Sequence, residues 1–336
     1  MALVFPTRSR VSAIAVMTAA IVVGALAVGS YAVGRRLDPE LRFLDPRRAP
    51  TIDEAGPAQS IEYALRSDEE NDVVFFGDST CRTGIDPVSF DRLTGLHSYN
   101  IGSGRGLGPN GMAVTVMAYL LHHPRPRAVV MCVTPFCFEA DGTTLGGDLP
   151  DRFVASYGPE VAGVVTETET FAYFIRCGAV SILDSEAREV RDDRLVGLER
   201  ETYHSSDSKL RKSRGFFGLP GDHGPQRGVG PGPENMVHED WDRWIRRIAE
   251  VCGDVRLIVR FTPIASEYAD AREFRQLDLW AARLETDHPN AVVTRPIVVP
   301  FERSLMWDSI HLNAAGVEKF MPLVAKDVQA TLSHRG

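Results

Sequence analysis

Apolar runs alternate with amphipathic stretches along most of the chain beyond residue 60, and this alternation predicts the elements of the fold. Short runs, most of them mainly apolar, indicate buried strands, here at residues 73–76, 97–101, 128–133, 255–262 and 291–294. Longer stretches with one apolar stripe indicate helices, here at residues 87–94, 112–122, 238–252 and 269–286, with a last helix from residue 314. Strands without a polar face that alternate with helices are typical of a parallel sheet covered on both sides. We therefore expect an α/β fold.

A long segment interrupts the alternation after the third predicted strand. It covers residues 136–237, and its pattern is partly helical in the first half. The second half contains RGFFGLPGDHGPQRGVGPGPEN, which is too rich in glycine and proline to form a sheet. One interpretation is a loop over the domain surface that shapes a substrate site. The other is a disordered excursion.

The N-terminal part of the chain predicts a membrane anchor. Residues 11–34 carry no charge and are numerous enough for a helix to cross a bilayer. A cleaved signal peptide is the alternative, but its apolar region is usually shorter. The predicted organisation is a short tail at residues 1–10, a single-pass transmembrane helix at 11–34, a linker rich in proline and charge at 35–60, and a folded domain at 61–336.

The charges around this segment leave its orientation open. Arg8 and Arg10 precede it, whereas a larger group of arginines follows it before residue 49. Basic residues concentrate on the cytoplasmic side, so their count favours a cytoplasmic domain. A short tail followed by an anchor and one large domain is, however, how secreted enzymes are tethered. By this analogy we expect the domain outside the cytoplasm.

Composition and motif spacing exclude several partners. The chain has 336 residues, of which 44% are hydrophobic, and its net charge of −8 leaves no basic surface for a nucleic acid. The five cysteines and nine histidines show no metal-ligand spacing, so we expect neither a metal site nor a cofactor. Gly106, Gly108 and Gly111 do match the GxGxxG pattern of a dinucleotide site. Pro109 stiffens that turn, however, and no acidic residue ends the next strand to bind a ribose.

A serine follows the first predicted strand. The strand runs VVFF into Gly77, Asp78 and Ser79. In open parallel sheets, ligands bind at the carboxyl ends of the strands. Gly77 permits a sharp turn and Asp78 can cap the turn that follows, which leaves Ser79 facing the crevice. A serine needs a base to become a nucleophile.

The predicted base lies just before the last helix. In MWDSIHLNAAG, Asp308 and His311 are three residues apart, and on a turn this spacing can bring the carboxylate to the imidazole. Asp308 would fix the tautomer of His311, and His311 would take the proton of Ser79. These three residues are the predicted catalytic triad.

These motifs resemble those of the SGNH (GDSL) hydrolase superfamily over most of residues 73–330. GDST is similar to the first block of that family, which implies Ser79 as the nucleophile. WDSIHLN is similar to the last block, which implies His311 as the base and Asp308 as its partner. The resemblance also implies a flavodoxin-like, three-layer α/β/α sheet with the long insertion after the third strand. The family contains esterases, lipases, deacetylases and acyltransferases, so an acyl-ester substrate is expected.

The stretch YNIGSGRG resembles the second block of the family, whose glycine donates a backbone N–H to the oxyanion hole. Gly104 and Gly106 are both candidates for this donor. The backbone N–H of Ser79 is expected to be another donor, as in the family.

This chain departs from the third block of the family. An asparagine normally follows the third strand, but this chain has Thr134, Pro135 and Phe136 there. Loss of one oxyanion donor typically costs about a hundredfold or more in rate. Asn100 or Asn110 would have to replace the missing side chain.

Two functions are compatible with these features. The anchor and the motifs GIDP, YNIG and TP are similar to those of membrane-anchored members that act on the bacterial envelope. We expect a serine-dependent hydrolase or O-acyltransferase that forms an acyl-serine and acts on an envelope polysaccharide or lipid. The alternative is a scaffold or binding protein of the envelope that keeps the fold with weak or no catalysis, which the missing asparagine permits.

Overall fold

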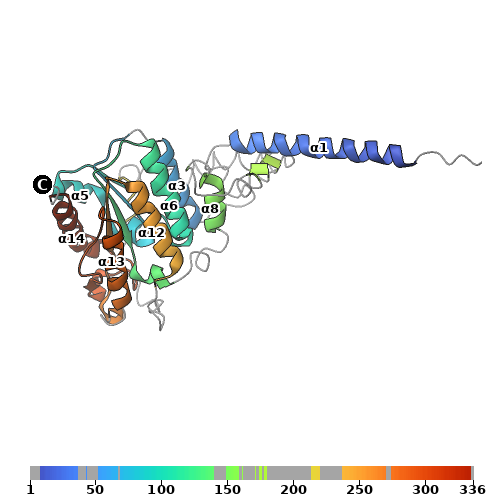
Figure 1. Cartoon of the computed structure of the whole chain (residues 1–336). Helices are drawn as coiled ribbons and strands as arrows, with labels where there is room; N and C mark the ends of the chain where they lie inside the picture. Colours follow the sequence, from blue (N-terminus) through green and yellow to red (C-terminus); the bar gives the residue numbers. More distant parts are fainter. Residues whose placement is uncertain are drawn as a thin grey trace, which may run out of the picture.

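A five-stranded parallel sheet forms the centre of the computed structural model (Figure 1). The structure describes residues 8–36, 43, 52–66, 69–139, 149–158, 161, 171, 174–175, 178–179, 213–219, 237–269 and 274–333. The strand order is β2-β1-β3-β4-β6, and all neighbouring strands are parallel. The strands are β1 (Val73–Gly77), β2 (Ser98–Asn100), β3 (Ala128–Val133), β4 (Arg256–Phe261) and β6 (Ala291–Val293). The prediction of an α/β protein with a parallel sheet is confirmed.

Successive side chains of β1 enter two different cores. Val74 and Phe76 belong to one buried cluster, and Val73 and Phe75 belong to another. The first cluster contains side chains of α3 (Ile52–Arg66), α6 (Gly108–His122), α12 (Glu239–Cys252) and α13 (Arg275–Asp287). The second contains side chains of α5 (Pro87–Thr94) and α14 (Ala314–Ser333). Because strand side chains alternate between faces, helices cover both sides of the sheet (Figure 1).

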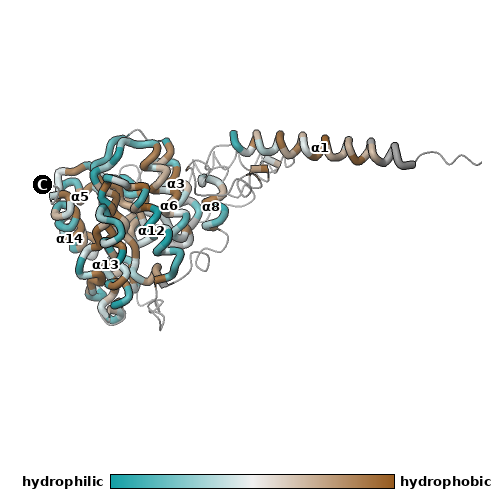
Figure 2. The backbone as a smooth tube through the Cα atoms, in the orientation of Figure 1, coloured by the Kyte–Doolittle hydropathy of each residue, from teal (hydrophilic) through white to brown (hydrophobic). Residues whose placement is uncertain are grey.

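Local sequence explains why the helices begin and end where they do. Asp86 caps α5 by accepting a hydrogen bond from the Val88 N–H, a proline follows the cap, and Gly95 ends the helix in the left-handed conformation. In α12, Trp241 and Ile245 lie on one buried stripe. Figure 2 shows the hydrophobic segments gathered at the centre of the sheet domain, with hydrophilic stretches on its outer helices.

The structure differs from the predicted elements in several places, including the start of α6 at Gly108 instead of residue 112. The helix α3 occupies residues 52–60 of the predicted linker and buries Ala58 and Ile61 against α6, because tertiary packing outweighs local composition there. The helix predicted from residue 269 begins at Arg275 as α13, after the 3₁₀ turn Ser266–Tyr268. A short helix, α4 (Ser79–Gly84), follows β1 directly. The small parallel pair β5 (Ile264–Ala265) and β7 (Pro300–Phe301) was not predicted.

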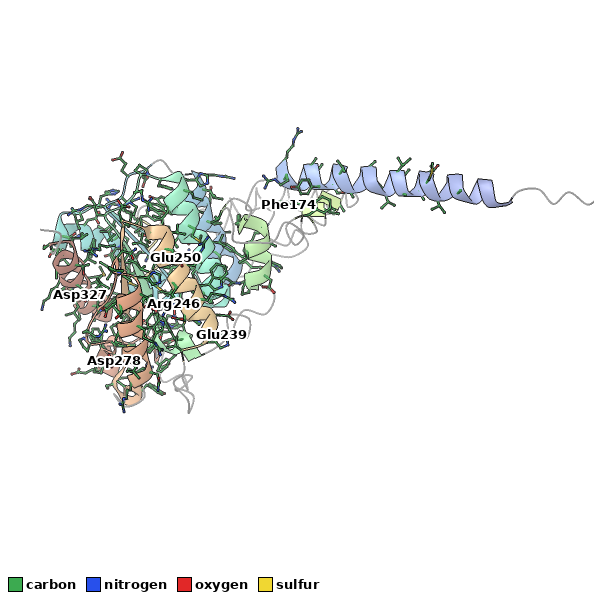
Figure 3. All side chains as sticks on the ribbon, viewed as in Figure 1. Phe174, Glu239, Arg246, Glu250, Asp278 and Asp327 are labelled. Atoms are coloured by element: carbon green, nitrogen blue, oxygen red, sulfur yellow. The ribbon has the colours of Figure 1, made fainter. Side chains whose placement is uncertain are left out.

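The predicted anchor is a helix, α1 (Arg8–Arg36), that extends away from the sheet domain (Figure 1). Its segment Ala15–Arg36 is long and apolar enough to cross a membrane, although an N-terminal signal sequence would meet the same criteria. Side chains such as Ile21 and Val28 are exposed. Near its C-terminal end, Tyr31 and Arg35 contact the ring of Phe174, with 5.7 Å between the centres of the Tyr31 and Phe174 rings (Figure 3).

Parts of the predicted insertion at residues 136–237 are described. It contains the 3₁₀ turn Pro135–Glu139 at its start and α8 (Leu149–Tyr157), which packs against α6. Residues 213–219 form a further described segment. The rest of the predicted insertion up to residue 236, apart from residues 158, 161, 171, 174, 175, 178 and 179, lies outside the described residues.

Candidate active site

The turn after β1 places Ser79 at the carboxyl end of the sheet. Gly77 has a φ of 151°, and a Cβ atom there would lie 1.7 Å from the carbonyl oxygen of Cys132 on β3. Only glycine therefore lets β1 end this close to its neighbour. Asp78 caps α4 by accepting hydrogen bonds from the N–H groups of Thr80 and Cys81, so Ser79 is the first residue of the helix.

The carboxylate of Asp78 ties this turn to the end of β3. It is fully buried, and one oxygen accepts hydrogen bonds from the Thr80 N–H at 2.9 Å and the Thr80 hydroxyl at 2.5 Å. The other oxygen accepts from the Thr134 N–H at 3.1 Å and from the Cys137 thiol at 2.9 Å. A buried charge is tolerated only when it is well hydrogen-bonded. Asp78 thus fixes the position of Ser79 without contacting its hydroxyl.

The three side chains of the predicted triad lie in hydrogen-bond contact. Ser79 Oγ is 2.9 Å from His311 Nε2, and His311 Nδ1 is 2.7 Å from Asp308 Oδ2. The histidine therefore bridges a hydroxyl and a carboxylate through its two different nitrogens. This is the order of contacts in which a histidine can remove a serine proton.

A tight loop before α14 aligns Asp308 and His311. Met306 and Leu312 form an antiparallel bridge, and the Trp307 N–H donates to the His311 carbonyl at 2.7 Å. Within the loop, Asp308 Oδ1 accepts from the N–H groups of Ile310 at 2.8 Å and His311 at 2.7 Å. One carboxylate oxygen thus closes the turn while the other contacts the ring.

The electrostatics of Asp308 favour its ionised form. Burial raises the pKa of this carboxyl, but the hydrogen bond and charge of His311, together with the N–H groups of Ile310 and His311, outweigh burial. The net pKa lies below its ordinary value. The ring of Trp307 lies 6.1 Å from the His311 ring and is roughly perpendicular to it. The sequence reasoning gave this tryptophan no role, although it directly precedes Asp308.

The loop after β2 brings one predicted oxyanion donor near the turn that carries Ser79. The Ser103 N–H donates to the Gly77 carbonyl at 2.9 Å. Gly104 is the next residue in the chain after Ser103, so this contact brings it close to the turn at Gly77. Among the described residues, the Gly104 N–H has no hydrogen-bond partner. Gly106 lies within the next 3₁₀ turn, Arg105–Leu107.

Neither asparagine suggested by the sequence is shown to replace the missing donor. Asn100 uses its amide NH₂ for the carbonyls of Cys81 at 3.0 Å and Ile85 at 2.9 Å, and its oxygen accepts from the Gly102 N–H at 2.8 Å. It supports the loop, and it is not free to bind a substrate. Asn110 accepts a hydrogen bond from the Gly111 N–H in the first turn of α6 at 2.9 Å.

The position just past β3 carries no side-chain donor aimed outward. Phe136 is buried and packs near Phe274, with 6.1 Å between ring centres. The hydroxyl of Thr134 is buried and has no hydrogen-bond partner among the described residues. Among the described residues, neither side chain is shown to replace the missing asparagine, so backbone N–H groups remain the candidate donors.

Other reactive groups near the site are held in unreactive forms. Burial raises the pKa of the Cys81 thiol well above its ordinary value, and a hydrogen bond with Cys132 adds to this. In the GxGxxG stretch, a Cβ atom at Gly111 would lie 2.4 Å from the side chain of Leu107, so this glycine serves close packing. Within the described ranges, no group of three or more His, Cys, Asp and Glu side chains could hold a metal ion.

No protein-family model matches the chain, and no significant relative was found among curated proteins. The function is therefore inferred from the geometry of the site.

Proposed function

We propose that the chain is a serine-dependent acyl-ester enzyme of the SGNH hydrolase class, acting as a hydrolase or an O-acyltransferase. The observation that carries this proposal is the continuous contact from Ser79 through His311 to Asp308, with heavy-atom distances of 2.9 and 2.7 Å. These are hydrogen-bond distances for a nucleophile, its base and the group that orients the base.

The sheet order supports this class. The order β2-β1-β3-β4-β6, counted in sequence, is the order of flavodoxin-like doubly wound sheets. In such sheets the order in which strands are added reverses between the first and third strands. Ligands bind outside the carboxyl ends of these two strands. Ser79 follows the first of these strands and Thr134 the other. The nucleophile thus stands where the fold binds ligands.

The geometry supports a two-step reaction. His311 Nε2 accepts the proton of Ser79 Oγ as that oxygen attacks the carbonyl carbon of an ester. The ionised Asp308 keeps the other proton on Nδ1 and stabilises the imidazolium. The imidazolium then protonates the leaving alcohol, which leaves an acyl-serine. Water or an acceptor hydroxyl, deprotonated by the same nitrogen, removes the acyl group.

Backbone donors would stabilise the developing oxyanion. The N–H of Ser79 lies outside the hydrogen-bond ladder of α4 because it is the first helical residue. The N–H of Gly104 is its proposed partner. With no asparagine at Phe136, we expect slow hydrolysis of small esters, since each missing donor costs about a hundredfold or more. A larger acceptor held in place can recover rate through positioning.

The proposed substrates are acyl esters of an envelope polysaccharide or lipid, with α1 as the tether and the domain outside the cytoplasm. The alternative function is an envelope scaffold with weak or no catalysis, and the observation that favours it is the buried Phe136 where the family has a donor. The three aligned side chains favour the enzyme, because a scaffold has no use for all three.

Labelling with a serine-directed fluorophosphonate tests the proposal. The full-length chain in detergent is expected to be labelled, and Ser79→Ala is expected to abolish the signal. Ser89→Ala is the control, since Ser89 lies on α5 and its hydroxyl donates to Asp86. Equal labelling of the parent and Ser79→Ala would reject Ser79 as the nucleophile. Absence of labelling in the parent would favour the scaffold.

The tether is tested separately. If α1 crosses the bilayer, the full-length protein is expected to stay with membranes after alkaline carbonate washing. Protease added to intact spheroplasts is then expected to digest the domain. Protection of the domain would place it in the cytoplasm, as the arginine count favours.

A further inference from the structure

Residues 213–219 of the insertion run along the exposed edge of the sheet beside the candidate active site. The Arg214 carbonyl accepts a hydrogen bond from the N–H of Asn100, the last residue of β2, at 3.0 Å. The Phe217 N–H donates to the carbonyl of Arg82 at 3.0 Å. These contacts fasten the segment at two points, one on an edge strand and one on the helix that begins with Ser79. We call residues 213–219 the edge segment.

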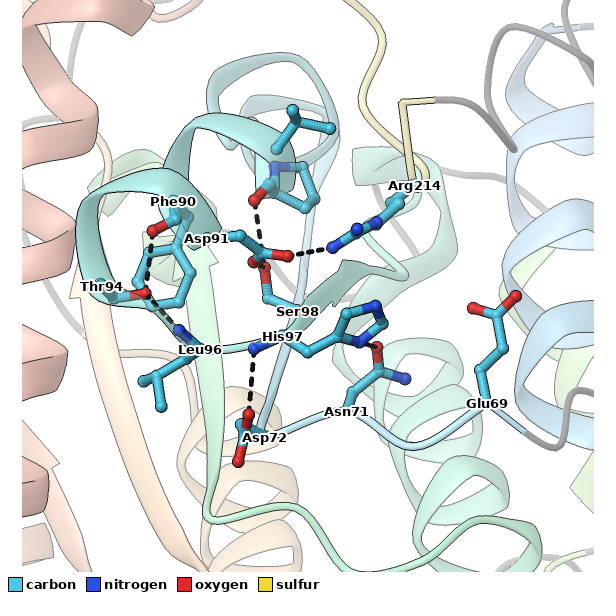
Figure 4. A network of polar contacts seen from close by, with 12 residues as sticks. Glu69, Asn71, Asp72, Phe90, Asp91, Thr94, Leu96, His97, Ser98 and Arg214 are labelled. Carbon is cyan, nitrogen blue, oxygen red and sulfur yellow. Dashed lines mark hydrogen bonds and ion pairs between the residues drawn. The ribbon is translucent and has the colours of Figure 1, made fainter.

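An ion pair and an unusual backbone hold the edge segment. The guanidinium of Arg214 pairs with Asp91, which also accepts a hydrogen bond from the Ser98 hydroxyl at 2.6 Å (Figure 4). Arg214 and Gly215 have φ values of 52° and 87°, both in the left-handed region. A Cβ atom at Gly215 would lie 1.9 Å from the Asn100 carbonyl oxygen. A left-handed conformation costs a non-glycine residue such as Arg214 about 1 kcal/mol or more, so this path is specifically maintained.

The two phenylalanines of the edge segment differ in environment. Phe216 packs against the core cluster that contains Cys81 and Leu312. Phe217 is 40% exposed. Arg82, whose carbonyl holds Phe217, is three residues after Ser79, and residues at this spacing are neighbours on one helix face. The backbone of Phe217 is therefore held by α4, the helix that begins with Ser79, while part of its side chain stays in solvent.

We infer that Phe217 binds a sugar ring of the acceptor in the proposed acyl transfer; this inference rests on the proposed function. An apolar chain binds in a groove that encloses it, whereas Phe217 keeps 40% of its surface in solvent. An open aromatic ring suits a flat ligand with an apolar face and polar edges, because the face stacks while the hydroxyl groups stay in water. A pyranose ring has this form.

Acyl transfer from p-nitrophenyl acetate to cellotetraose tests the inference, with acetylated product measured by mass spectrometry. In the full-length protein in detergent, Phe217→Ala is expected to raise the KM for cellotetraose about tenfold, the loss typical of one stacking contact. Phe217→Trp is expected to retain the parent KM. Fluorophosphonate labelling of Ser79 is expected to stay unchanged in both. Leu279→Ala, at an exposed apolar position on α13, is the control.

The outcomes separate this inference from the proposed function. A parent that labels at Ser79 but does not transfer acetyl to cellotetraose overturns the sugar site and leaves the nucleophile in place. An unchanged KM in Phe217→Ala has the same meaning. If Phe217→Ala raises the KM for 1-decanol and leaves that for cellotetraose unchanged, the ring binds apolar chains and the inference is wrong. A parent without labelling fails the proposed function itself.

Discussion

The end of the central sheet at which its strands begin, here called the amino edge, and the end at which they finish, the carboxyl edge, use similar side chains in opposite ways. At the amino edge, Asn71 donates to the hydroxyls of Tyr63 at 2.9 Å and Tyr119 at 3.1 Å, and its oxygen contacts His97 at 3.0 Å (Figure 4). His123 stacks on Tyr119 with 4.1 Å between ring centres, and both its nitrogens contact backbone carbonyls. At the carboxyl edge, a histidine instead contacts the hydroxyl of Ser79.

The difference lies in what the polar groups have as partners. At the amino edge, each of these groups is paired with a group that stays in place, so the network stabilises the fold. At the carboxyl edge, His311 is held by a carboxylate on one side and meets a partly exposed hydroxyl on the other. A histidine is poised for proton transfer only in the second arrangement. Substituting a histidine at each of the two edges tests this difference.

The largest expected effect comes from the two histidines. His311→Gln removes the proposed base and is expected to slow fluorophosphonate labelling by about 10²–10⁴-fold with little change in the unfolding midpoint. His123→Gln is expected to keep the labelling rate and to lower the free energy of unfolding by about 1–3 kcal/mol, because buried contacts are lost. Labelling kinetics and urea unfolding of both variants provide the check. Similar effects on labelling at both positions would remove the functional distinction between the edges.

Asp308→Asn is expected to have the next largest effect. An amide can still close the turn through its oxygen, but its NH₂ group cannot accept the hydrogen bond from the His311 Nδ1–H, so the labelling rate is expected to fall by about 10²–10⁴-fold. The pH dependence has a definite sign. Because the pKa of Asp308 is lowered in the folded state, its ionised form contributes stability above the unfolded pKa of about 3.9. This contribution is lost as the pH falls through the folded pKa.

Urea unfolding between neutral pH and about pH 3 measures this contribution, since the interval reaches below the unfolded pKa of a carboxyl. The difference in stability between the parent and Asp308→Asn is expected to shrink as the solution is acidified. Asp254→Asn is the control, because the Asp254 side chain is 86% exposed. A difference that stays constant with pH would mean that Asp308 is not stabilised in its ionised form.

Most of the sheet could be predicted because its central strands β1 and β3 are short and apolar on both faces. The helices α5 and α14 were also located correctly, since capping residues and loop signals mark their starts. Residues 52–60 were mistaken for a linker because Pro57 and the charges suggested one, whereas the burial of Ala58 against α6 is visible only in three dimensions.

Within the candidate site, only the residues that belong to a sequence motif could be predicted. Ser79 and His311 are 232 positions apart, and the fold brings them into contact. The five donors to Asp78, the engagement of Asn100 and the placement of the edge segment could not be predicted. Each depends on contacts between residues distant in sequence, for which no local pattern exists.

A third prediction tests the amino edge. Asn71→Ala removes three hydrogen bonds and leaves the buried hydroxyl of Tyr119 without this donor. The free energy of unfolding is expected to fall by about 2–4 kcal/mol, while labelling at Ser79 stays at the parent rate. Gln276→Ala, at an exposed position on α13, is the control and is expected to stay within about 0.5 kcal/mol of the parent. A loss of labelling that exceeds the fraction unfolded would mean that the two edges are coupled.

The smallest expected effect concerns Cys137, whose thiol is one of the donors to Asp78. Cys137→Ala is expected to cost about 1 kcal/mol of stability, the typical value of one hydrogen bond, and to slow labelling a few-fold, because Asp78 positions the turn that carries Ser79. Cys137→Ser restores a donor and is expected to recover the rate. Cys252→Ala removes a sulfur atom buried away from the site, where burial raises the pKa of the thiol to about 12. It is therefore expected to lower stability without slowing labelling. Equal labelling rates in the two alanine variants would show that the donors to Asp78 stabilise the fold and do not align the nucleophile.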